Sequence, residues 1–270
     1  MAEEPSTKHH QDEQSDESSN LVDVHSSDKN INLVDVHVPG EKREYTRTLP
    51  GVELHSKEML EIVCTSEPDK AGEVMSRLGM KGGGLYPSFI GVDVDFTMDD
   101  EPPQMAAVLQ LCVEELCLVY HITTATKWPK RLKGFLQEEK LYTFVGFSIG
   151  GDKRMLNKSG LEINPNNFID MQRKWKDPRT NKYYDSLADV AGGIIHSFYS
   201  GMKKKMDKGE HQLWGTSPLP DNLIMYAGID AYATYKSWKT IDNIVTGWDI
   251  SKKSRRLTPT TTATLRDEDA

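Results

Sequence analysis

The stretch Phe89–Thr97 places the strongest constraint on how this chain can fold. It is short, apolar and rich in β-branched residues, and the polar run Met98–Glu101 follows it, so it predicts a buried strand. Asp93 and Asp95 lie two residues apart, so in a strand they point to the same face, about 6.6 Å apart along the chain. Two carboxylates on one apolar strand are costly unless a cation or water compensates them. Because hard divalent cations prefer oxygen ligands, the pair indicates either a metal site or a solvated sheet edge.

Charge and composition divide the chain of 270 residues into three parts. Residues 1–50 hold eleven of the 41 acidic residues and five of the 33 basic ones, which leaves 30 acidic and 28 basic residues for the remainder. With few aromatic residues, residues 1–50 cannot offset the entropy of ordering and are predicted to be a disordered acidic tail. Residues 51–247 are predicted to form one domain, and residues 248–270 a tail that is first basic and then rich in threonine.

The acidic tail contains an internal repeat. The six residues Asn20–His25 recur unchanged as Asn32–His37, and each copy alternates apolar and polar residues as a small strand does. The repeat is either a neutral duplication or a segment that pairs with a sheet edge of a protein partner.

Cysteine use and hydropathy exclude several classes of protein. Cys64, Cys112 and Cys117 form no CxxC pair, which predicts buried free thiols in a reducing compartment rather than a zinc site or a disulfide framework. The first twenty residues are polar and no apolar run approaches about 18 residues, so neither a signal peptide nor a membrane span is expected. We expect the nucleus or the cytoplasm, with Lys252–Arg256 as a candidate nuclear signal.

Periodicity predicts a strand, a helix, a three-strand meander and then alternating helices and strands. Such an order indicates an α/β domain with a mixed sheet and helices on its faces. The predicted strands are Leu60–Thr65, Phe89–Thr97, Ala106–Cys112, Leu116–Ile122, Tyr142–Phe147 and Asn167–Met171. The predicted helices follow Ser66 and Gly150, or span residues 128–136, 183–200 and 221–245.

Two further acidic residues occupy positions with both ordinary and functional interpretations. Asp152 follows two glycines at a strand-to-helix turn, where a helix N-cap is the ordinary role. Asp230 lies inside the last predicted helix, four residues after Tyr226 and on the same helical face. Taken singly, Asp230 is a solvated acid and Tyr226 a half-buried core residue.

Together these motifs resemble the DEDD superfamily of 3′–5′ exonucleases, over roughly residues 55–245. The order is Asp-x-Asp on the first long strand, Gly-Gly-Asp at a strand-to-helix turn, and Tyr-x-x-x-Asp late in a helix. This order is similar to the tyrosine-type branch, which includes RNase D and the Werner-syndrome exonuclease domain, and most similar to small plant proteins with a lone exonuclease domain. The resemblance implies a ribonuclease-H-like α/β fold, with a three-strand antiparallel meander, parallel strands and helices on both faces.

The resemblance also implies a role for each motif residue. Asp93 would bridge two divalent cations, Mg²⁺ or Mn²⁺, with Asp95 and Asp230 beside one ion and Asp152 beside the other. Tyr226 would orient the attacking water, and the product would be a nucleoside 5′-monophosphate released from a 3′ end of nucleic acid.

Asp95 departs from the family, which has glutamate at this position. The shorter side chain can place its carboxylate more than about 1 Å from the metal, and misplacement of that size can cost about a hundredfold in rate. The chain is therefore expected to be either a 3′–5′ exonuclease, impaired or better served by manganese, or a catalytically weak or inactive nucleic-acid-binding or scaffold member of the family.

Basic and aromatic residues suggest a path for a single-stranded substrate. The candidates nearest the motifs are Phe96, Thr97, Lys153, Arg154, Lys203 and Lys204. Two further basic groups are Lys127, Lys130, Arg131 and Lys133, and the residues around Trp175, namely Arg173, Lys174, Lys176, Arg179 and Lys182. Charge and stacking together suit single strands, although isolated lysines are often only solvated.

Overall fold

The computed structural model describes residues 43–81, 88–97, 104–138, 140–204 and 209–256, without the side chains of residues 202–204 and 248–256. The strands are β1 (Thr46–Glu53), β2 (Met59–Thr65), β3 (Ser88–Phe96), β4 (Ala106–Val113), β5 (Leu116–His121), β6 (Tyr142–Gly146) and β7 (Phe168–Asp170). The α-helices are α1 (Pro68–Lys81), α2 (Leu132–Gln137), α3 (Gly150–Lys158), α4 (Met171–Lys174), α5 (Leu187–Ile194) and α6 (Asp221–Arg256). Short 3-10 helices include η1 (His55–Lys57), η3 (Ser197–Lys204) and η4 (Glu210–Gly215).

All seven strands form one mixed sheet, in the order β1-β2-β5-β4-β3-β6-β7. Strands β3, β4 and β5 make the predicted antiparallel meander, while β2 pairs with β5, β3 with β6, and β6 with β7 in parallel. Every residue of β4 and β5 is buried, which fits their place in the middle of the sheet. The predicted mixed α/β architecture, a three-strand meander extended by parallel strands, is confirmed.

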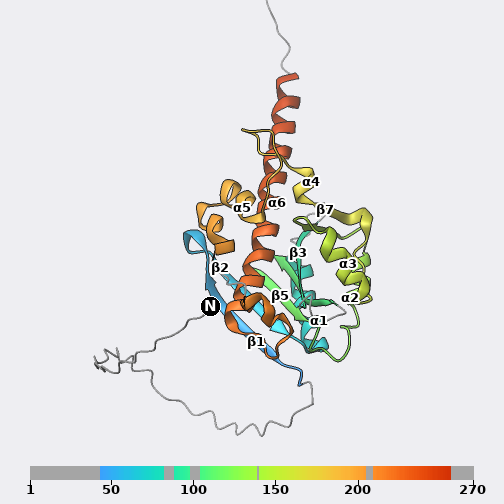
Figure 1. Cartoon of the computed structure of the whole chain (residues 1–270). Coiled ribbons are helices and arrows are strands. Elements are labelled where there is room, and N and C mark those ends of the chain that lie inside the picture. Colours follow the sequence, from blue (N-terminus) through green and yellow to red (C-terminus); the bar gives the residue numbers. More distant parts are fainter. Residues whose placement is uncertain (1–42, 82–87, 98–103, 139, 205–208, 257–270) are drawn as a thin grey trace, which may run out of the picture. The chain divides into compact units, whose positions relative to one another are not determined.

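Helices cover both faces of this sheet. Because strand residues alternate between faces, Glu61 and Ile62 of β2 point in opposite directions. Glu61 forms an ion pair with Arg77 of α1, whereas a Cβ placed on Gly228 of α6 would collide with the side chain of Ile62. Thus α1 and α6 lie on opposite faces, and α6 runs across the front of the sheet in Figure 1.

Two glycines allow α6 to pack directly against the strands. A Cβ on Gly91 of β3 would collide with the carbonyl oxygen of Ala231 and would lie 2.8 Å from Tyr235 Cβ. Gly228 makes the reciprocal approach from α6 to Ile62. Because neither residue has a side chain, the middle of α6 lies close to β3, on the face where Asp93 and Asp95 also point.

Four element boundaries differ from the predictions. Strand β1 begins at Thr46, inside the predicted tail, because it pairs antiparallel with β2. Helix α2 begins only at Leu132, and the helix expected over residues 183–200 is α5 followed by η3. Helix α6 continues to Arg256 and so includes part of the predicted C-terminal tail. The repeats in the N-terminal tail lie outside the described residues.

The prediction of buried cysteines without disulfide bonds is confirmed. The three cysteines are buried free thiols. No helix in the described part of the chain combines the length and the apolar character needed to cross a membrane.

Candidate active site

Asp93 and Asp95 lie on β3 beneath α6. They share a face with Gly91, the point of closest approach to α6, and both side chains are only partly exposed. Asp93 is opposite Gln110 of β4, and Asp95 is opposite Val108. The pair therefore lies toward the C-terminal end of a central strand, and the solvated sheet edge considered from sequence is wrong.

Asp152 lies in the first turn of α3, beyond the C-terminal end of β6. Strand β6 runs parallel to β3, so this turn opens at the same end of the sheet as Asp95. Ile149, not Asp152, occupies the N-cap position of α3, so the ordinary capping role proposed for Asp152 is wrong. Its carboxylate is half-buried and close enough to Asp93 for the two charges to interact.

Tyr226 and Asp230 are on the segment of α6 that approaches β3. Both are half-buried, and burial and the charge of Asp230 are among the causes that raise the pKa of the Tyr226 hydroxyl. The Tyr226 ring also contacts His211 edge-on at 5.8 Å and Trp214 at 6.4 Å between ring centroids. Met225, the residue before Tyr226, is 41% exposed, so Tyr226 is the residue that faces the carboxylates.

Burial and mutual repulsion raise the pKa of these carboxyl groups. Burial raises the pKa of Asp93 to about 6, and burial together with the charges of Asp93 and Asp170 raises the pKa of Asp152 to about 8. Burial and the charges of Asp93, Asp230 and Asp152 raise the pKa of Asp95 well above its usual value. Burial and these acids also raise the pKa of Tyr226. The four acids of the sequence motifs therefore converge in one electrostatic environment.

This donor set fits divalent cations in its chemistry. Four carboxylates supply hard oxygen ligands, and no lysine or arginine among the described residues forms an ion pair with Asp93, Asp95 or Asp152. As the side chains stand, however, no group of three or more acidic, histidine or cysteine side chains in the described residues forms a ready metal shell.

Gln110 is a site residue that the sequence analysis did not identify. Its side chain is fully buried in β4, and its Nε2 donates a 2.7 Å hydrogen bond to Oδ2 of Asp95. Its Oε1 is buried without a hydrogen-bond partner in the described residues. The available signal was a lone amide inside the apolar segment Ala106–Val113. Gln110 holds the shorter acid of this chain in one orientation.

Asp170, at the end of β7, is a second residue that was missed. Its Oδ1 accepts hydrogen bonds from the backbone N–H of Ser148 at 3.0 Å and of Gln172 at 3.2 Å, and Oδ2 lies 3.4 Å from Arg173 Nε. Ser148 has a positive φ of 58° in the turn that leads into α3. Asp170 therefore orders the turn that presents Asp152.

Sequence comparison finds relatives with a common activity. No family model matches the chain. A 3′-5′ exonuclease of Drosophila melanogaster is 28% identical over 138 residues, which cover 48% of this chain and 37% of that protein. The Drosophila sechellia 3′-5′ exonuclease is 28% identical over 170 residues, covering 60% of this chain and 46% of that protein. The chain is a homologue of 3′–5′ exonucleases. The matches span less than half the length of these curated relatives.

Solved structures show that the exonuclease homologue shares its fold with known exonuclease domains. The Aedes aegypti Nibbler EXO domain aligns with a TM-score of 0.55 and 15% identity, over 73% of this chain and 93% of that domain. The catalytic core of RRP6 from Trypanosoma brucei, as the C496S mutant, aligns with a TM-score of 0.53 and 14% identity, over 74% and 51%. The ribonuclease-H-like fold predicted from the motifs is confirmed by these alignments, and the sequence matches confirm the resemblance to 3′–5′ exonucleases.

The residues predicted to contact nucleic acid lie in different environments in the structure. Phe96 lies beside the first turn of α3, and Thr97 Oγ1 accepts a 3.0 Å hydrogen bond from Met105 N–H. Lys153 Nζ is 5.0 Å from the centroid of the Phe168 ring, and Arg154 is exposed. Lys203 and Lys204 end η3, but their side chains are outside the described set. These contacts stay predictions.

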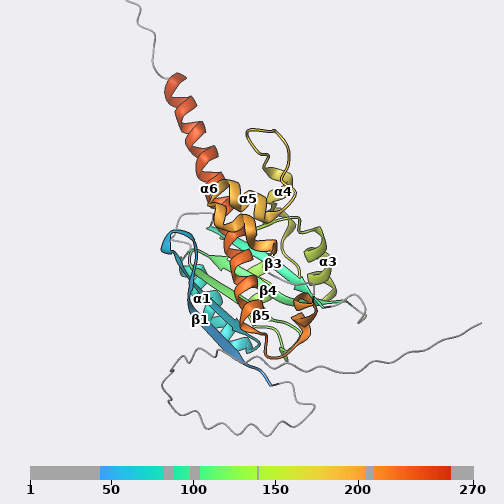
Figure 2. The ribbon, with the colours of Figure 1, turned by 60° about the vertical axis from the view of Figure 1, so that its left-hand side comes forward.

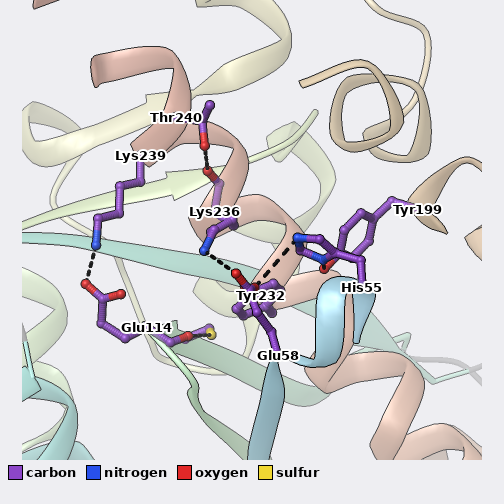
Figure 3. A network of polar contacts seen from close by, with 9 residues as sticks. His55, Glu58, Glu114, Tyr199, Tyr232, Lys236, Lys239 and Thr240 are labelled. Atoms are coloured by element: carbon purple, nitrogen blue, oxygen red, sulfur yellow. Dashed lines mark hydrogen bonds and ion pairs between the residues drawn. The ribbon is translucent and has the colours of Figure 1, made fainter. Parts of the chain in front are cut away.

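A second polar cluster occupies the next turns of α6. Tyr232 and Lys236 both donate hydrogen bonds to Glu58, and Lys239 donates to Glu114 (Figure 3). His55 joins the cluster through its Nε2, which lies 3.7 Å from Oε2 of Glu58, and its Nδ1 forms a 2.8 Å hydrogen bond with the Tyr199 hydroxyl. Glu58 and Glu114 each form an ion pair with a lysine, so we interpret the cluster as structural.

Proposed function

We propose that this protein is a two-metal-dependent 3′–5′ exonuclease that releases nucleoside 5′-monophosphates from the 3′ ends of nucleic acid. The observation that carries the proposal is the convergence of Asp93, Asp95, Asp152 and Asp230, from β3, α3 and α6, beside the hydroxyl of Tyr226. The homology to 3′-5′ exonucleases supports the same reaction.

Each residue has a role that follows from its surroundings. Asp93, Asp95 and Asp230 would hold one ion and Asp93 and Asp152 the other, either Mg²⁺ or Mn²⁺. Such ions, when bound, lower the pKa of water and stabilise charge on the phosphate. Tyr226, kept protonated because burial and the nearby acids raise its pKa, can donate a hydrogen bond that orients the nucleophile. Gln110 and Asp170 position Asp95 and the Asp152 turn.

The decisive experiment uses single strands labelled at the 3′ or the 5′ end, with magnesium or manganese. We expect early release of mononucleotide from the 3′ label and gradual shortening of the 5′-labelled strand. An Asp93→Ala variant should abolish both. Release first from the 5′ label, or an unchanged rate in the Asp93→Ala variant, would contradict the proposal.

One observation favours a second candidate, a binding or scaffold protein with weak catalysis. Asp95 replaces the family's glutamate and accepts a hydrogen bond from buried Gln110. This bond restricts movement of the Asp95 carboxylate toward an ion. An intact strand at high protein concentration, together with retained binding in a gel shift, would select this candidate. We propose the acidic tail as a site for a protein partner; binding of a partner that is lost when residues 1–42 are removed from the chain would support this.

A further inference from the structure

Residues 174–183 form a hairpin, here called the basic hairpin, whose backbone is held by several hydrogen bonds. Lys176 and Tyr183 form an antiparallel bridge, and Asp177 N–H donates to the Lys182 carbonyl at 2.8 Å. The carboxylate of Asp177 accepts hydrogen bonds from Arg179 N–H at 2.8 Å and from Thr180 Oγ1 at 3.1 Å. These hydrogen bonds lower the pKa of Asp177, so its negative charge stabilises the turn of the hairpin.

The base of the hairpin is anchored in a small apolar cluster. Trp175 and Tyr184 pack around buried Val145, Met171 and Ile241, which come from β6, α4 and α6. In Figure 2 the segment after α4, drawn in yellow, extends outward from that helix as an open loop. The hairpin is therefore fixed at its base and projects into solvent.

The projecting side chains are mostly cations. Lys174, Lys176, Arg179 and Lys182 are exposed, and Asp177 is the single acid within residues 174–183. Tyr183 is 52% exposed, and Lys176 Nζ lies 4.8 Å from the centroid of its ring. A fixed backbone that presents cations around an exposed aromatic ring suits a polyanion with unstacked bases.

The basic hairpin begins close to the candidate active site. Asp170, four residues before Lys174, accepts a hydrogen bond from Ser148 in the turn that leads to Asp152, and its charge contributes to the raised pKa of Asp152. A strand whose 3′ end lies at the four carboxylates can therefore continue toward the hairpin.

We propose that the basic hairpin binds the single-stranded segment of the substrate next to its 3′ end. The four cations contact phosphates and Tyr183 stacks on a base. This inference rests on the proposed exonuclease function and adds a substrate class to it, namely single-stranded nucleic acid or duplexes with a single-stranded 3′ overhang.

The test compares two matched quadruple variants of the full chain. In one, Lys174, Lys176, Arg179 and Lys182 become alanine. In the control, the exposed Lys57, Lys81, Lys140 and Lys158 become alanine, so the same number of positive charges is removed from positions outside every predicted nucleic-acid-binding group. Fluorescence anisotropy with a labelled 20-nucleotide single strand, without a divalent cation and over a series of salt concentrations, gives the Kd.

We expect the hairpin variant to bind at least about tenfold more weakly, with its salt slope reduced by about 3, because each lost phosphate contact removes about 0.7. The control should change the Kd less than about threefold. Tyr183→Ala should weaken binding about fivefold or more and Tyr183→Phe should not, because the phenyl ring still stacks. Equal effects of the two quadruple variants, or no effect of the hairpin variant, would overturn the proposal.

The outcomes separate this inference from the proposed function. If the hairpin variant loses affinity while the wild-type chain releases no mononucleotide, the binding surface stands and the nuclease proposal fails. If mononucleotide is released and the hairpin variant binds normally, the exonuclease stands and the hairpin proposal fails.

Discussion

Half-buried acids beside two neighbouring regions of α6 have pKa values shifted in opposite directions. Around Tyr226 and Asp230 the helix faces acids on β3 and α3, and burial with mutual repulsion raises their pKa values. Two turns later, burial tends to raise the pKa of Glu58, but hydrogen bonds from Tyr232 and Lys236 outweigh it and lower the pKa below its usual value. The same holds for Glu114 with Lys239.

We interpret this difference as the distinction between the proposed active site and a structural cluster. An acid that stabilises a fold is most useful when a cation or donor accompanies it, as at Glu58. In the first region, no lysine or arginine that the structure describes forms an ion pair with Asp93, Asp95 or Asp152, so ionisation of these acids costs stability unless a ligand supplies positive charge. We propose that one helix therefore spans a ligand-binding site and a cluster that only stabilises the fold, and four predictions test this division.

The largest effect is expected from Asp230→Asn compared with Glu58→Gln. Asp230→Asn should lower kcat by about 1,000-fold, the upper range for loss of one group that stabilises transition-state charge. Glu58→Gln should leave kcat unchanged but lower the free energy of unfolding by about 1–3 kcal/mol, because Lys236 loses its ion pair. Initial rates and urea unfolding measure the two effects. Loss of activity in Glu58→Gln, at a temperature where it is folded, would break the division.

The two tyrosines of α6 provide the next comparison. Tyr226→Phe should lower kcat by about 100-fold, because the hydroxyl orients the nucleophile, with little effect on stability. Tyr232→Phe should keep kcat and lower stability by about 1 kcal/mol, since Glu58 loses a hydrogen bond. Single-turnover rates and thermal unfolding of both variants decide the matter. Equal losses of activity would show that neither hydroxyl has a special role.

Asp95→Glu tests the departure from the family. The longer acid should raise the magnesium-dependent rate by about tenfold. This gain is smaller than the roughly hundredfold cost of a misplacement of about 1 Å, because the hydrogen bond from Gln110 already orients the carboxylate of Asp95. The gain should be smaller with manganese. Rates with each metal, for the single variant and for Asp95→Glu combined with Gln110→Leu, measure the effect. An unchanged or lower magnesium rate would exclude the short side chain as a limitation.

The smallest effect concerns the pH dependence of stability. The folded-state pKa values of Asp93 and Asp152 are raised to about 6 and about 8, so the folded protein retains protons that the unfolded chain has lost. The stabilisation that these retained protons give the folded state is complete below the unfolded pKa of about 4. It is lost as the pH rises through the folded-state pKa values. In EDTA, the melting temperature should fall by a few degrees between pH 6.5 and 8.

Variants and metal give the controls for this slope. Asp93→Asn combined with Asp152→Asn should flatten it, and Mn²⁺ should stabilise the wild type most at the upper end of the range. Glu58 and Glu114 have lowered pKa values, so their contribution is lost only as pH falls through the acidic range, outside this window. A melting temperature that rises from pH 6.5 to 8 in EDTA would contradict the raised pKa values.

Much of the fold could be predicted from local patterns. The meander, β6, the start of α3 and the start of α6 follow from periodicity and from the residues at their ends, which are properties of neighbouring residues. Strand β1 was missed because it is mostly exposed and contains Pro50 and Gly51; it forms a strand only by pairing with β2. Gln110 and Asp170 were missed because their partners, Asp95 and Ser148, lie 15 and 22 residues away.

The sequence by itself determined which acids could act together: alternation puts Asp93 and Asp95 on one face of a strand, and helical spacing puts Tyr226 above Asp230. The tertiary structure alone decided that these groups meet, because close packing at Gly91 and Gly228 brings α6 onto the sheet. It also decided which acids have cations beside them, since Lys236 and Lys239 reach Glu58 and Glu114 only through the fold. Electrostatic interactions depend on distance in space, and separation along the chain does not set that distance.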